Sequence, residues 1–177
     1  MILEELKQLE IESKDRGIPI IGSKKGRFLY KKVIELKPRR ILELGTANGY
    51  SGIILGHLGA EITTIDVDAK IQKEAKQNYK RFCINANVIN GDGVKIVTEM
   101  AKNSSELYDV IFLDFIKKGY LEVMEACIKL VRKNGLIIAD NISFQGCQDY
   151  KEAVLKDKRL RTEIISIGDG LASSKKL

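Results

Sequence analysis

The chain has 177 residues, of which 44% are hydrophobic and 31% charged, a composition that fits one globular domain over residues 1–177. Its three cysteines are far apart and lack metal-like spacing, so neither a disulfide framework nor a zinc site is indicated. A net charge of +6 would favour anionic partners, but 30 basic and 24 acidic residues are mixed along the chain, which is typical of a solvated surface.

Residues 1–38 precede the first predicted strand. Their beginning, MILEELKQLEIESKDRG, places Ile and Leu at helical spacing among charged residues. The segment lacks the long apolar stretch of a signal peptide or a membrane span. We therefore expect a helical N-terminal segment, no membrane association and a cytoplasmic protein, with residues 39–177 forming the α/β core.

After Pro38 the chain alternates short β-rich runs with helical patterns. The β-rich runs are 40–44, 61–66, 86–90, 108–114 and 136–140, and the helical patterns are 51–58, 69–82, 94–101 and 120–131. A last helix at 147–155 is followed by 161–167, the turn Gly168-Asp169-Gly170 and 171–175, the pattern of a β-hairpin. The alternation predicts an α/β fold with a doubly wound, mostly parallel sheet and a C-terminal antiparallel hairpin.

The stretch RRILELGTANGYSGIILG, residues 39–56, is a strand, a glycine turn and a helix, an arrangement that presents backbone N–H groups to a ligand. Tyr50-Ser51 follows Gly49 where a phosphate-binding loop needs Lys-Ser/Thr, and Ala47 disfavours the dinucleotide fingerprint. The turn instead suits a cofactor without phosphates and with a positively charged amino-acid group, near Glu43. Asp66, at the end of the next strand, is placed to accept hydrogen bonds from ribose hydroxyls.

Ligands of doubly wound sheets bind outside the carboxyl ends of the strands. Acids stand at or beside four of these ends, as Glu43, Asp66, Asp114 and Asp140. For Asp92, which follows the third strand, capping of the next helix is the stronger interpretation. That interpretation is weaker for Asp114 and Asp140, which we therefore treat as candidate site residues.

Four ordered motifs give the chain a resemblance to a known family. ILELGTANGYS resembles the first cofactor motif of the divalent-metal-dependent O-methyltransferases, the group of catechol and caffeoyl-CoA O-methyltransferases. ITTIDVD is similar to the ribose-binding acid of that family, VIFLDFIKKGY to its Asp-x-x-Lys-x-x-Tyr segment, and GLIIADN to its Asp-Asn pair. The similarity runs from about Ile20 to the C-terminus.

The resemblance implies an S-adenosylmethionine-dependent O-methyltransferase with a Rossmann-like class I methyltransferase sheet. Its acceptor would be a small molecule with adjacent hydroxyls. The cofactor-binding residues that the resemblance implies are Ile21, Gly22, Glu43, Gly45, Ala47, Gly49, Ser51, Asp66, Val67, Asp92, Gly93, Asp114 and Phe115. The implied ligands of a catalytic divalent cation, Mg²⁺ first with Mn²⁺ or Ca²⁺ as alternatives, are Asp114, Asp140 and Asn141. Asp114 also counts as catalytic, and Lys117 is the implied general base.

The residue types suit this chemistry. A hard cation held by two carboxylates and an amide oxygen can chelate vicinal hydroxyls and lower the pKa of a bound hydroxyl. Because the cofactor must approach the backbone of the glycine turn, we expect Gly45→Val to abolish cofactor binding and leave the fold intact. Tyr50, Tyr120 and the lone His57 are expected to be packing residues.

The chain departs from the family at Asp66, where relatives generally have Glu, and at Ile116, where they are often polar or aromatic. The segment before the first strand is also short, so the methyl acceptor stays open. Methylation of a hydroxyuridine in transfer RNA is one alternative, favoured by basic pairs such as Lys24-Lys25. A cofactor-binding protein without catalysis is another, and a homodimer is one possible assembly.

Overall fold

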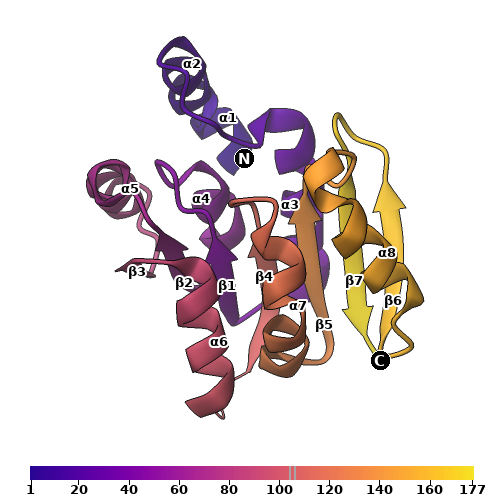
Figure 1. Ribbon diagram of the computed structural model, residues 1–177. Helices are drawn as coiled ribbons and strands as arrows, with labels where there is room; N and C mark the ends of the chain where they lie inside the picture. Colours follow the sequence, from indigo (N-terminus) through magenta and orange to yellow (C-terminus); the bar gives the residue numbers. More distant parts are fainter. Residues whose placement is uncertain (104, 106) are drawn as a thin grey trace.

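The structure, a computed structural model, describes residues 1–103, 105 and 107–177 (Figure 1). Within these residues lies one seven-stranded sheet of order β3-β2-β1-β4-β5-β7-β6. The strands are β1 (Arg40–Leu44), β2 (Glu61–Asp66), β3 (Ala86–Asn90), β4 (Tyr108–Leu113), β5 (Val131–Asp140), β6 (Leu160–Ile165) and β7 (Leu171–Lys176). Neighbours are parallel from β3 to β5, whereas β7 is antiparallel to both β5 and β6. The predicted fold class, with its C-terminal antiparallel hairpin, is confirmed.

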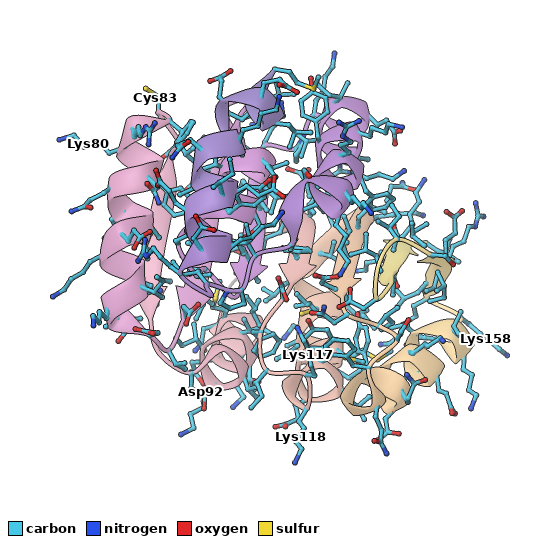
Figure 2. The ribbon with its side chains drawn as sticks, turned by 90° about the horizontal axis from the view of Figure 1, so that it is seen from above. Lys80, Cys83, Asp92, Lys117, Lys118 and Lys158 are labelled. Carbon is cyan, nitrogen blue, oxygen red and sulfur yellow. The ribbon has the colours of Figure 1, made fainter. Side chains whose placement is uncertain are left out.

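Helices cover both faces of the sheet, which is seen from above in Figure 2. The helices on one side are α3 (Gly22–Leu36), α4 (Tyr50–Gly56) and α5 (Ala69–Arg81), and those on the other are α6 (Gly93–Asn103), α7 (Gly119–Leu130) and α8 (Gln148–Lys156). The short helices α1 (Ile2–Glu5) and α2 (Lys7–Asp15) precede α3, and a 3₁₀ turn (Gln145–Cys147) precedes α8.

The central strands β1 and β4 are mostly apolar because both of their faces are covered. Ile41 packs in the core under α3, α4 and α5, whereas the next residue, Leu42, packs in the core under α6, α7 and α8. Phe112 and Leu113 of β4 divide between the two cores in the same way. Burying each such side chain stabilises the fold by about 1.5–3 kcal/mol, so this pattern fixes the sheet at the centre of the molecule.

The main difference from the predicted boundaries is at β5, which begins at Val131 and not at Leu136. Helix α7 ends at Leu130 and passes directly into the strand, where Val131 pairs with Tyr108 before the register shifts. Asn134 adopts φ 64°, so a local kink follows this first pair. Residues 131–135 have no regular alternation, and periodicity alone therefore indicates no strand there.

The N-terminal segment packs over the carboxyl end of the sheet, where α1 and α2 lie at the top of Figure 1. The Tyr50 hydroxyl donates to Glu10 of α2 (3.1 Å), and the Asn48 amide donates to Ser13 (2.7 Å). These buried hydrogen bonds tie α2 to the glycine turn after β1. Across the described parts of the chain, no helix has the length and apolar character needed to cross a bilayer.

Candidate active site

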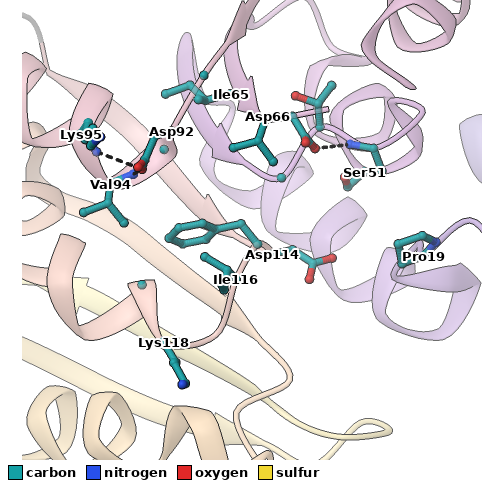
Figure 3. A pocket seen from close by; sticks show the side chains of 18 of the residues that line it. Pro19, Ser51, Ile65, Asp66, Asp92, Val94, Lys95, Asp114, Ile116 and Lys118 are labelled. Carbon is teal, nitrogen blue, oxygen red and sulfur yellow. Dashed lines mark hydrogen bonds between the residues drawn. The ribbon is translucent and has the colours of Figure 1, made fainter. Parts of the chain in front are cut away.

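A cavity of about 760 Å³ lies at the carboxyl ends of β1, β2 and β4 (Figure 3). This volume is typical of a cavity that holds a small molecule or cofactor. The cavity brings together residues from five segments that the sequence analysis assigned to cofactor binding. They are Ile21, Gly45, Ala47, Ser51, Asp66, Val67, Asp92, Gly93, Asp114 and Phe115.

The glycine turn forms one wall of this cavity. Gly45 has φ 101°, and a Cβ atom there would lie 1.9 Å from the Asp114 carbonyl oxygen. Only glycine therefore lets β1 and the end of β4 approach this closely. Gly49, with φ 90°, begins α4 and is buried against Tyr79, so it shapes the turn without lining the cavity.

Asp66 ends β2 and is held in place by the backbone. Its Oδ2 accepts from the Ala47 N–H (3.0 Å), and its Oδ1 accepts from the Asp68 N–H (3.0 Å). A carboxylate oxygen has a second acceptor site, so each oxygen can still accept from a ligand hydroxyl. The side chain is only half-buried and lines the cavity, as the ribose-binding prediction requires.

The opposite end of the cavity is more apolar. Phe115 stacks on Tyr120 with ring centroids 5.4 Å apart, and Val67 and Ile116 are 72% and 68% exposed at the rim. Asp92 caps α6 by accepting from the Val94 N–H (2.9 Å) while it lines the cavity (Figure 3). This end therefore offers an apolar surface on which a planar ring could stack, flanked by one acid.

Glu43 lies behind the turn and does not line the cavity. It is fully buried, and its carboxyl accepts from Ser51 (2.6 Å), Thr64 (2.7 Å) and Tyr79 (3.3 Å). Burial raises the pKa of Glu43 to about 7. The structure thus gives Glu43 the position of a structural link beneath the turn, away from direct contact with a cofactor.

A second cavity, of about 520 Å³, adjoins the first and is lined by Asp114, Asp140, Asn141 and Gly22. Both cavities are bordered by Asp114 and by the apolar run 19–21. Burial, together with the charge of Asp114, raises the pKa of Asp140 to about 6, which leaves it ionised at neutral pH. Four carboxylates thus line one partly buried space, those of Glu10, Asp114, Asp140 and Asp169.

Lys117 lies close to the junction of the two cavities. Its Nζ donates to Asp114 Oδ1 (3.0 Å) and to the Tyr120 hydroxyl oxygen (3.1 Å). The Tyr120 hydroxyl donates in turn to the Leu113 carbonyl (2.9 Å). Burial raises the pKa of Tyr120, so this side chain stays protonated and positions the lysine. Tyr120 is fully buried, as expected of a packing residue.

The sequence analysis did not assign Lys25 and Asp169 to the site. Lys25 was counted among the basic surface residues and Asp169 as part of a turn, yet Lys25 Nζ contacts carboxylate oxygens of both Asp140 and Asp169. Burial alone would lower the pKa of Lys25, but the two carboxylates outweigh it and raise that pKa. The only sequence signal was the position of Asp169 between two glycines in a turn near the end of the sheet.

The donor set of the second cavity fits a hard divalent cation. The oxygens come from Asp114, Asp140 and Asn141, and no His or Cys is among the described residues that line this cavity. The Asn141 Nδ2 donates to Asp169, so its Oδ1 is the atom left to bind a cation. Among the residues that the structure describes, no three His, Cys, Asp or Glu side chains form a metal-binding group by themselves, so the amide oxygen would be required.

Comparisons with known proteins identify the family of the chain. A family model described as O-methyltransferase matches residues 1–177. Catechol O-methyltransferase B of Danio rerio is 32% identical, over 80% of this chain and 57% of that protein. Tapetum-specific methyltransferase 1 of Arabidopsis thaliana is 27% identical, over 99% of this chain and 86% of that protein. The chain therefore spans little more than half the length of the first relative.

The fold is also found among solved structures. An O-methyltransferase from Bacillus cereus, crystallised in complex with SAH, matches with a TM-score of 0.85 and 24% identity. The match covers 99% of this chain and 90% of that chain. At this level of identity the likeness demonstrates a shared fold.

Proposed function

Because the chain belongs to the O-methyltransferase family, we propose that it transfers a methyl group from S-adenosylmethionine to a hydroxyl of a small molecule with adjacent hydroxyls. The observation that carries this proposal is the junction at Asp114, which borders both the larger cavity and the smaller acidic one. A donor in the first cavity and an acceptor in the second would meet there.

The larger cavity supplies the contacts that S-adenosylmethionine needs. Asp66 would accept from the ribose hydroxyls, Phe115 would offer its ring to the adenine, and the backbone of residues 45–47 would border the methionine end. The apolar run 19–21 lines both cavities and would border the path of the methyl group.

In the smaller cavity, Asp114, Asp140 and Asn141 would hold a divalent cation, most simply Mg²⁺. When bound, it would orient adjacent hydroxyls and lower the pKa of the reacting one. Lys117, whose Nζ lies 3.0 Å from Asp114 Oδ1, would take the hydroxyl proton, and Asp114 would stabilise the ammonium form of this lysine. Holding the oxygen in line with the methyl group supplies much of the rate enhancement.

Transfer RNA finds less support as the acceptor. One member of the Lys24-Lys25 pair is withdrawn from the surface, because Lys25 is only 6% exposed and contacts two carboxylates. This pair therefore contributes one surface charge fewer than the sequence indicates.

The proposal is tested by transfer of a labelled methyl group to catechols, flavonoids and hydroxyuridine-containing RNA, with and without Mg²⁺. Calorimetry with S-adenosylhomocysteine measures cofactor binding separately. We expect cation-dependent transfer to a catechol. Binding without transfer to any acceptor would favour a non-catalytic cofactor-binding protein, and transfer to RNA alone would overturn the small-molecule acceptor.

A further inference from the structure

Lys25 is the buried one of the three lysines that line the smaller cavity, the others being the exposed Lys14 and Lys24. It lies in the first turns of α3, and its side chain is 8% exposed. Lys25 pairs with Asp140, which is also a predicted ligand of the cation and whose side chain is 3% exposed. The other carboxylate, Asp169, is 31% exposed at the cavity edge. The ammonium group thus bridges a deeply buried acid and an accessible one.

Asp140 has few partners besides this lysine. Its Oδ1 accepts from the Asn141 N–H (2.7 Å), and the same oxygen contacts Lys25 Nζ. A divalent cation that takes Asp140 as a ligand would bring a second positive charge beside this ammonium group. Two cations at hydrogen-bonding distance of one oxygen repel each other strongly where water is largely excluded.

Asp169 is rigidly placed to receive the displaced lysine. The Ser143 N–H donates to the Asp169 carbonyl (3.0 Å), and the Ile142 N–H donates to the Gly170 carbonyl (3.3 Å). These bonds join the β6–β7 turn to the loop that carries Asp140 and Asn141. Asp169 also accepts from the Asn141 amide, which aims the Asn141 carbonyl oxygen away from it.

We propose that Lys25 is a tethered cation that competes with the divalent cation for Asp140, and that Asp169 is the positioning residue to which it withdraws. This inference rests on the cation site of the proposed function. It adds that the affinity for the cation depends on Lys25, which competes for Asp140, and on Asp169, which accepts the withdrawn lysine. Removing the lysine should tighten cation binding. Neutralising Asp169 should weaken cation binding, because Asp140 is then the only carboxylate left to pair with Lys25.

The test is a titration of the full chain with Mn²⁺ in the presence of S-adenosylhomocysteine. The electron paramagnetic resonance signal of the free ion measures how much Mn²⁺ is bound. Lys25→Met should bind Mn²⁺ at least about tenfold more tightly than the unaltered chain, and Asp169→Asn about tenfold more weakly. Lys24→Met is the matched control, because Lys24 lines the same cavity and has the same charge but is exposed. Its affinity should change by less than about twofold.

Calorimetry with S-adenosylhomocysteine checks that each variant is folded, and Lys25→Gln replaces Lys25→Met if the latter is not. Equal affinity of Lys25→Met and the unaltered chain would overturn the competition and leave the cation site standing. A gain in Lys24→Met as large as in Lys25→Met would reduce the effect to net charge and also overturn it. Absence of Mn²⁺ binding in every variant would remove both the competition and the cation from the proposed function.

Discussion

Gly45 shows how one residue serves both the fold and the site. Its missing Cβ lets the backbone of β1 approach the Asp114 carbonyl, and its positive φ directs the turn into the larger cavity. The expectation that Gly45→Val leaves the fold intact does not fit this geometry. The new Cβ would collide with the backbone carbonyl of Asp114, which directly follows β4. The contact is invisible in the sequence, where the two residues are far apart.

Gly45→Ala should therefore reduce the free energy of unfolding by about 2–5 kcal/mol, the sum of a left-handed backbone conformation and an overpacked contact. Gly59→Ala is the control, since Gly59 has φ 90° but open space around its Cβ position. It should cost only about 1–2 kcal/mol. Urea denaturation measures both, and equal losses would mean that the contact with Asp114 contributes nothing.

Lys117 is the second residue with a sharp expectation. Lys117→Ala should lower the rate of methyl transfer roughly 10²–10⁴-fold if this lysine takes the hydroxyl proton, and the loss should shrink as pH rises and the acceptor ionises unaided. Lys118, which is exposed at the edge of the larger cavity and points outward in Figure 2, provides the control, because it has the same charge. A pH–rate profile of Lys118→Ala should show no such recovery, and a wild-type rate for Lys117→Ala at neutral pH contradicts the role.

At the scale of elements, Glu43 joins four of them. It belongs to β1 and accepts hydrogen bonds from Ser51 of α4, Thr64 of β2 and Tyr79 of α5. This arrangement anchors the glycine turn from below. It also places an ionisable group where its charged form is poorly solvated.

The unfolding free energy should consequently depend on pH through Glu43. Because the folded pKa of about 7 lies above the ordinary value of 4.5, the folded chain keeps a proton that the unfolded chain loses. The contribution of Glu43 to the free energy of unfolding is fully present below pH 4.5. It falls by up to about 3 kcal/mol as pH rises to 7. Glu43→Gln should remove this decline, and parallel stability curves for the two proteins would contradict it.

At the scale of the whole molecule, the site is assembled from both ends of the chain. Helix α2 contributes Glu10 and helix α3 contributes Lys25. Asp114 directly follows β4, Asp140 is the last residue of β5, and Asp169 lies in the β6–β7 turn. The N-terminal segment, although short, still covers the carboxyl edge of the sheet. The two cavities therefore remain distinct, although Asp114 and the apolar run 19–21 border both of them.

Excess chelator should accordingly stop methyl transfer while leaving S-adenosylhomocysteine binding unchanged, because the predicted cation ligands other than Asp114 do not line the larger cavity. Asp140→Ala should have the same two effects. Mg²⁺ should restore activity to the chelated protein but not to the variant. Transfer that continues in chelator would contradict the cation-dependent chemistry and leave the cofactor site untouched.

The sequence by itself determined the fold class, the family resemblance and ten of the residues that line the larger cavity. The comparisons confirm that resemblance. These features depend on local information: apolar periodicity, a glycine turn and the acids that end parallel strands, which a sheet necessarily gathers at one edge. Asp66 could be placed for that reason, whereas Phe115 was assigned through the family resemblance.

Only the tertiary structure decided that Glu43 lies beneath the turn and that Lys25 enters the acidic cavity. Lys25 is 115 residues from Asp140 and 144 from Asp169 in the sequence. Whether a long, charged side chain points to solvent or into a cavity depends on which loops converge above the sheet, and local composition contains no record of that packing. The pairing of these three charges is thus a property of the folded chain.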